Sequence, residues 1–199
     1  MADGSERRDT TAEDEVRVRG VAFLNLLNAA RVKGGVGLGD ALLDRMPSQL
    51  ASAIREKAFD PNAYRPVREL RDAHTALRDI TGSGPEISRE YARFVLEHET
   101  PLIFRVFLRS LTPDMLLPRA QGVFRRFYDR GELRILDRSR GSAVGEFRGC
   151  VGFNESLWLD VLGGCEGALI ATGARDVRIA FVTDCLEGTS QRRLIAQWA

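Results

Sequence analysis

The chain has 199 residues, a formal net charge of +1 and 44% hydrophobic residues, a composition typical of a soluble globular protein. The near-neutral charge argues against a general electrostatic nucleic-acid binder, and no apolar run approaches the ~18 residues of a membrane span. Three widely spaced cysteines argue against a disulfide framework, and the polar start lacks the apolar core of a signal peptide. We therefore expect a cytoplasmic protein.

The N-terminal part of the chain is predicted to be mainly helical. Residues 1–14 are predicted to form a disordered tail, and the alternating pattern over 15–20 predicts a short strand. Helical spacing of apolar residues follows over 21–32, 40–57, 67–80 and 86–99, while 101–111 is apolar nearly all round and should be buried. Gly35, Gly37 and Gly39 follow a helix and precede no Lys-Ser/Thr pair, so we expect a flexible interhelical loop and not a phosphate-binding loop.

A helix start at Thr112 and Pro113 predicts one further helix, which runs to about Arg130 with a kink at Pro118. After Gly131 the hydrophobic period changes from helical to alternating.

The C-terminal part is predicted to contain four strands and one helix. The alternating segments 132–138 and 144–153 predict a hairpin, and Asn154 is expected to cap a helix that ends near Thr172. Gly163, Gly164 and Gly167 inside this helix indicate close backbone packing, and two further strands are predicted over 176–184 and 192–198. The sequence thus predicts an α+β fold, with a helical part over 15–131 and a ββαββ antiparallel sheet unit over 132–199 in a single domain.

Few residues suggest chemistry. His74 and His98 both lie on apolar helix faces, where a hydrogen-bonded core histidine is more common than a ligand. The three cysteines, Cys150, Cys165 and Cys185, form no C-x-x-C pair, so core packing is favoured over a metal site. Acidic residues are expected only at the ends of apolar runs and not inside them. No sequence motif for a catalytic nucleophile is present. We therefore expect neither an enzyme nor a resident metal.

Several phrases, taken in their order along the chain, carry a resemblance to a known family. They are EVRVRGVAF at 15–23, PNAYRPV at 61–67, LTPDMLL at 111–117, FYDRGEL at 127–133, and Cys185 ahead of the closing Trp198. Together they resemble a myxobacterial paralogous family of uncharacterised proteins. The layout is also distantly similar to vinyl-reductase-like domains, vesicle-tethering transport-particle subunits and haem nitric-oxide-binding domains.

These distant resemblances imply an apolar pocket between the helices and the sheet, and they bear on cofactors. Vinyl-reductase-like domains that bind metal carry a second cysteine soon after the one matching Cys185, where this chain has Gln191 and Arg192. Haem-binding relatives require an axial histidine in the helix before the sheet and a Tyr-x-Ser-x-Arg motif. The helix predicted over 113–130 has no histidine, and the tyrosine is missing around Ser139. We therefore expect no cofactor, with haem disfavoured, although His98 keeps haem from being excluded.

The function expected from these observations is a non-catalytic sensory or regulatory module that binds a small, largely apolar ligand. Its pocket wall is predicted to include His98, Phe104 and Phe107, with Cys165 facing them from the helix beside the sheet. The alternative is a protein–protein interaction module, a homodimer or an adaptor, with a filled core and no ligand.

Overall fold

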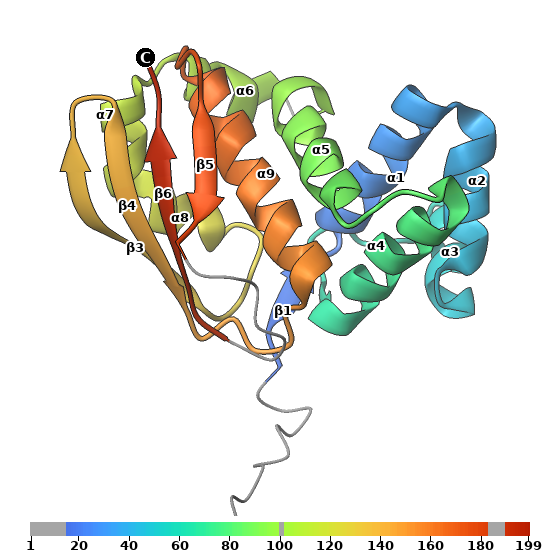
Figure 1. Ribbon diagram of the computed structural model, residues 1–199. Coiled ribbons are helices and arrows are strands. Elements are labelled where there is room, and N and C mark those ends of the chain that lie inside the picture. Colours follow the sequence, from blue (N-terminus) through green and yellow to red (C-terminus); the bar gives the residue numbers. More distant parts are fainter. Residues whose placement is uncertain (1–14, 100–101, 183–189) are drawn as a thin grey trace, which may run out of the picture.

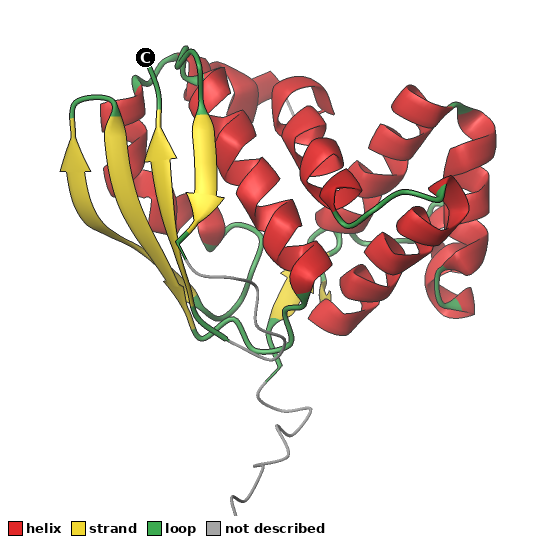
Figure 2. Ribbon diagram, viewed as in Figure 1, coloured by secondary structure: helices red, strands yellow, loops and turns green. Residues whose placement is uncertain are grey.

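The computed structural model describes residues 15–99, 102–182 and 190–199, and the side chains of Glu99 and of residues 102–105 lie outside the described part. An antiparallel sheet forms one side of the molecule, and helices cover one face of it (Figure 1, Figure 2). Helix α9 lies against the sheet, α5 packs on α9, and the N-terminal helices lie beyond α5. The predicted fold class, helices followed by an antiparallel sheet unit, is confirmed.

The helical part follows the predicted hydrophobic pattern with one correction. It comprises α1 (Val21–Gly34), α2 (Val36–Arg45), α3 (Ser48–Arg55), α4 (Val67–Thr81), α5 (Glu86–Phe94) and the π-helical turn η1 (Val95–Glu99). The predicted glycine loop is wrong, because Gly37 and Gly39 lie inside α2. Gly35 alone separates α1 from α2, and its φ of 83° is a conformation that glycine adopts at no steric cost.

The segment between the helices and the sheet is more broken than predicted. It contains α6 (Leu102–Arg109), α7 (Pro113–Leu116), the 3₁₀ turn η2 (Leu117–Arg119) and α8 (Ala120–Phe124). Thr112 caps α7 as expected, because its side chain accepts a hydrogen bond from the Met115 amide. The single helix expected to reach Arg130 is interrupted at Pro118, which has no amide hydrogen to continue the helical ladder.

The sheet has the strand order β3-β4-β6-β5, with every neighbouring pair antiparallel. Its strands are β3 (Glu132–Ser139), β4 (Ser142–Arg148), β5 (Arg178–Phe181) and β6 (Arg192–Gln197). Helix α9 (Glu155–Ala171) connects the β3–β4 pair to the β5–β6 pair. It is capped by Asn154, whose Oδ1 accepts a hydrogen bond from the Leu157 amide at 3.1 Å. The ββαββ order is therefore as predicted.

A small two-stranded sheet ties the two parts of the chain together. Strand β1 (Arg17–Arg19) pairs with β2 (Tyr64–Pro66), a short strand that sequence analysis did not predict. The other edge of β1 receives the chain after α8, where the Arg19 amide donates to the Phe127 carbonyl and the Asp129 amide donates to the Arg17 carbonyl. The first ordered strand is thus hydrogen-bonded to both the helical part and the region leading into the main sheet.

The core continues from the helices onto the inner face of the sheet. Trp158 of α9 is 1% exposed and contacts the rings of Phe147, Phe153 and Phe181 at centroid distances of 5.9, 5.0 and 5.8 Å. Such tilted and edge-on pairs add to the stabilisation from apolar burial. This aromatic cluster fixes the N-terminal end of α9 on the sheet. Over the described ranges, no helix is long and apolar enough to cross a membrane.

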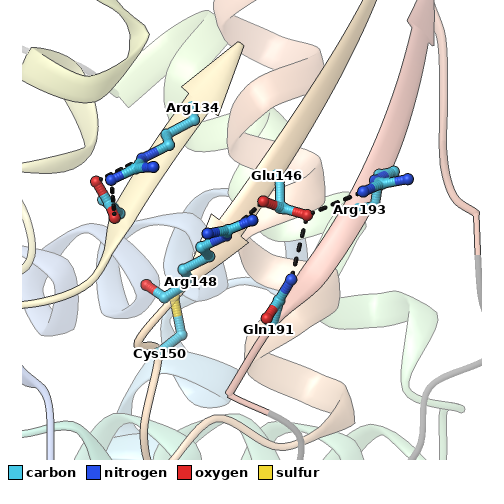
Figure 3. A network of polar contacts seen from close by, with 7 residues as sticks. Arg134, Glu146, Arg148, Cys150, Gln191 and Arg193 are labelled. Atoms are coloured by element: carbon cyan, nitrogen blue, oxygen red, sulfur yellow. Dashed lines mark hydrogen bonds and ion pairs between the residues drawn. The ribbon is translucent and has the colours of Figure 1, made fainter. Parts of the chain in front are cut away.

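The outer face of the sheet carries a buried carboxylate surrounded by cations (Figure 3). Glu146 on β4 is 1% exposed and accepts hydrogen bonds from Arg148 at 2.5 Å, Gln191 at 3.1 Å and Arg193 at 3.2 Å. The hydrogen bond from Arg148 lowers the pKa of Glu146 most, burial opposes it, and Arg193 and Gln191 lower it further. These bonds cross-link β4 to β6 and to the residues just before β6.

We expect Glu146 to make folding stability sensitive to acid. Because its pKa is lower in the folded chain than the ordinary 4.5, its contribution is complete above about pH 4.5 and is lost as pH falls through the folded value. Melting temperatures between pH 7 and pH 3 should therefore fall more steeply in the wild type than in Glu146→Gln. Glu132→Gln, which removes a partly exposed partner of Arg134, is the control and should follow the wild-type slope. Parallel curves for Glu146→Gln and the wild type would contradict this expectation.

Candidate ligand-binding cavity

A cavity of about 180 Å³ lies between the helices and the inner face of the sheet and is partly open to solvent. It is slightly larger than the ~150 Å³ apolar cavity that is known to hold benzene in an engineered protein. Its wall is formed by α1, α4, α5, η1, α9, the segment from α7 to Tyr128 and all four strands of the main sheet. Its larger apolar members include Leu26, Leu70, Val95, Leu96, Phe124, Phe127, Val161, Leu169, Ile179 and Leu194.

Small residues on the sheet and on α9 leave this space unfilled. Gly145 lies in the wall on β4, and Gly164 and Ala168 lie in the wall on α9. A Cβ atom added at Gly164 would meet no atom within 4 Å. The cavity therefore arises because residues without long side chains stand where two layers of the fold face each other.

One pair of polar side chains, His74 and Asp160, interrupts the apolar wall. His74 comes from the middle of α4 and is 1% exposed, and Asp160 comes from α9 and is 22% exposed. The two side chains approach to 3.3 Å between Nε2 and Oδ1, while Nδ1 of His74 is buried without a hydrogen-bond partner. Buried polar atoms nearly always have a hydrogen-bond partner in folded proteins, so the unpartnered Nδ1 of His74 is an exception within this apolar wall.

The other ionisable groups of the wall are held in their neutral forms. Burial raises the pKa of Tyr128 well above its ordinary value, and the nearby charge of Asp160 raises it further. Burial also raises the pKa of Cys165 to about 12, and it raises the pKa of Cys150, which lies near Gly131, to the same value. A thiol with such a pKa is not a thiolate near neutral pH and is a poor nucleophile. The wall residues Tyr128 and Cys165 therefore provide no activated nucleophile.

The predicted wall residues fall in different places. Cys165 lines the cavity. Phe107 of α6 is 39% exposed, and His98 of η1 is exposed as well. The His98 ring stacks on the Phe94 ring with a centroid distance of 4.6 Å, and its Nδ1 lies 3.2 Å from the Phe94 carbonyl oxygen. The side chain of Phe104 lies outside the described part of the chain. A ligand-binding role for these four residues stays a prediction.

Sequence analysis missed the two polar residues that the structure brings together. His74 was expected to be a core histidine, and it is buried, but it also lines the cavity. The expectation that acidic residues interrupt apolar runs only at their ends is wrong at Asp160, which stands between Leu159 and Val161 in the apolar stretch of α9. A charged residue inside a run of buried positions was the signal that could have identified it.

The fold matches solved structures, although no protein-family model matches the sequence and no curated relative is found. An H-NOX protein from S. oneidensis in the Fe(II)NO state superposes with a TM-score of 0.68, at 12% identity over 91% of this chain and 99% of that chain. The Fe(II) unliganded H-NOX protein from K. algicida gives 0.65, at 11% identity over 91% and 96%. An oxygen-binding H-NOX domain related to soluble guanylate cyclases gives 0.60, at 14% identity over 90% and 94%.

These matches establish an α+β fold of the H-NOX type and support the distant resemblance to haem nitric-oxide-binding domains. The more specific resemblance to a myxobacterial family, and those to vinyl-reductase-like domains and transport-particle subunits, stay predictions. The expectation of no cofactor, with haem disfavoured, is contradicted. The neighbours carry iron, and one of them is described in terms of its haem redox potential. That expectation failed because it relied on local motifs, whereas the fold brings distant segments together around one cavity.

Proposed function

We propose that this chain is a non-catalytic sensory domain that binds its ligand in the cavity between the helices and the sheet. The observation that carries the proposal is the apolar cavity of about 180 Å³ with the buried His74–Asp160 pair in its wall. Ligand pockets have this character, since an apolar wall supplies affinity and a few polar groups fix orientation. The neighbours with the same fold bind nitric oxide and oxygen according to their titles, which supports a sensory role.

Haem is the first ligand to test, and His74 is the residue that would hold it. Its buried imidazole has an unpartnered nitrogen, and imidazole is a common axial ligand of haem iron. Histidines that bind metal usually have their other ring nitrogen held by a carboxylate, and Asp160 occupies that position. When bound, haem would supply a metal centre able to hold a diatomic gas.

Binding of haem in this cavity would require two conditions to be met. Haem is several times larger than benzene, so its entry requires helices to move away from the sheet. Among the described wall residues there is no lysine or arginine, so the two carboxylates of haem would be left to the side of the cavity that opens to solvent. A smaller, largely apolar ligand would need neither adjustment.

An absorption titration with haem, together with native mass spectrometry of the purified chain, tests the proposal. We expect a Soret band that is lost in His74→Ala and kept in His98→Ala, because His74 lines the cavity and His98 is exposed. Loss of the band in His98→Ala instead would assign the iron to η1, the turn that follows α5. If there were no Soret band, no co-purifying small molecule and no binding of a solvatochromic probe, the proposed function would be wrong.

The alternative of a homodimer or adaptor also stays a prediction, and one feature of the sheet favours it. Val182 and Ile195 are 50% and 40% exposed, and Ile195 shares the outer face with Val144, its cross-strand partner. Light scattering at increasing protein concentration would show whether a second copy covers this face.

A further inference from the structure

The cavity wall contains a carboxylate with unused hydrogen-bonding capacity. Asp160 stands in α9 among buried apolar neighbours, and within the described residues the 3.3 Å contact with Nε2 of His74 is the single polar contact of its side chain. Oδ2 therefore has no protein partner in that part of the chain. An ionised carboxylate can accept about four hydrogen bonds and donates none.

His74 determines which kind of group this carboxylate can receive. With Asp160 next to Nε2, the proton of a neutral imidazole belongs on that nitrogen, where it faces the carboxylate. One oxygen of Asp160 is thus directed to the imidazole, and the other remains an acceptor toward the cavity. A ligand that presents an acceptor to this point would be repelled, and a purely apolar ligand would give the second oxygen of the carboxylate no hydrogen-bond donor.

We propose that the cavity of the chain without haem takes a one- or two-ring, largely apolar molecule with an O–H or N–H group, which it donates to Asp160 beside His74. This inference rests on the proposed function and adds the chemical class of the ligand. The size follows from the cavity volume of about 180 Å³. The apolar body contacts wall residues such as Phe124, Phe127 and Leu169.

Phenol and toluene form a matched pair of probes for this inference, because they differ by an O–H in place of a methyl group. Isothermal titration calorimetry of the full chain should show phenol binding more tightly than toluene. An all-apolar cavity would give the opposite order, because the phenol hydroxyl would lose its hydrogen bonds with water and gain none. Haem and phenol should compete, since both would occupy this cavity.

Asp160→Leu should reverse the order of the two affinities, because it should weaken phenol binding about tenfold without weakening toluene binding. Asp72→Leu makes the same change at an exposed carboxylate on α4 and should leave both affinities as in the wild type. If Asp160→Leu does not fold, the order of the two probes in the wild type still decides the question. Equal binding, or tighter toluene binding, overturns the inference and leaves the proposed function standing. If neither probe, nor haem, nor a solvatochromic dye binds, the proposed function itself fails.

Discussion

Replacing Gly163 by alanine should destabilise the chain by at least about 2 kcal/mol, whereas the same change at Gly164 should stabilise it by up to about 1 kcal/mol. A Cβ atom at Gly163 would lie 2.1 Å from the carbonyl oxygen of Arg89, which belongs to the backbone of α5 and cannot rotate away. A Cβ atom at Gly164 would meet nothing within 4 Å. Both changes gain the same helix propensity, so their difference measures the close contact alone.

The contact at Gly163 belongs to a seam between α9 and the helices α5 and η1. One turn further along, a Cβ atom at Gly167 would lie 2.7 Å from the Cβ atom of Leu96 and 2.9 Å from the Arg93 carbonyl oxygen. Because residues four apart share a helix face, Gly163 and Gly167 form one strip against which the neighbouring backbone packs. Bulk on this strip would push α5 away from α9.

Charged side chains hold the same two helices together beside the glycine strip. Glu166 is 9% exposed and pairs with Arg89 at 3.0 Å and with Arg93 at 3.3 Å. Arg89 also donates to the carbonyl of Ile179 on β5 at 3.0 Å. The seam therefore joins α5, α9 and the sheet, and any displacement at Gly163 would have to break these bonds as well.

Thermal unfolding distinguishes the two glycines. For a chain of this size, a loss of about 2 kcal/mol corresponds to a melting temperature lower by about 4–8 °C in Gly163→Ala, and Gly164→Ala should melt at or above the wild-type temperature. Urea titrations of both variants check that the transitions stay two-state. Equal melting temperatures for the two variants would show that α5 does not approach α9 as closely as the structure has it.

The local elements could be predicted from the sequence because their signals are local. Asn154 marked the start of α9, the alternation after Gly131 marked the hairpin, and the glycines of α9 indicated close packing, which the structure shows at Gly163 and Gly167. The boundaries between consecutive helices were harder to predict. The glycine run was mistaken for a loop, because its low helix propensity is overridden by packing of α2 against α1 and α4.

The resemblance implied a pocket between the helices and the sheet, but most of the residues that line the cavity could not be predicted, because they come from elements that are distant in sequence. Gly145 and Gly164 carry no pattern that places them in the wall of one cavity. The same holds for His74 and Asp160, which meet because α4 and α9 both reach the wall. Sequence reasoning favoured aromatic residues for the pocket, although a filled core contains aromatic residues as well.

Gly164→Leu is expected to abolish ligand binding in the cavity without destabilising the fold. The new side chain would extend from a wall position where a Cβ atom has open space, so it would occupy volume that the ligand needs. Leucine also improves helix propensity by up to about 1 kcal/mol over glycine, and burying its side chain is favourable. We therefore expect phenol affinity to fall below detection, at least about 100-fold, while the melting temperature stays equal or rises.

Gly37→Leu is the matched control for this prediction. Gly37 is an exposed helical glycine of α2, a Cβ atom there also meets nothing within 4 Å, and it lies outside the cavity wall. This variant should gain helix propensity in the same way and keep wild-type affinity for phenol and haem. Calorimetry and the Soret titration, run on both variants beside the wild type, separate a blocked cavity from a general effect of adding leucine. Unchanged binding by a well-folded Gly164→Leu would place the ligand elsewhere on the molecule, because a side chain in the cavity and a ligand in the cavity exclude each other.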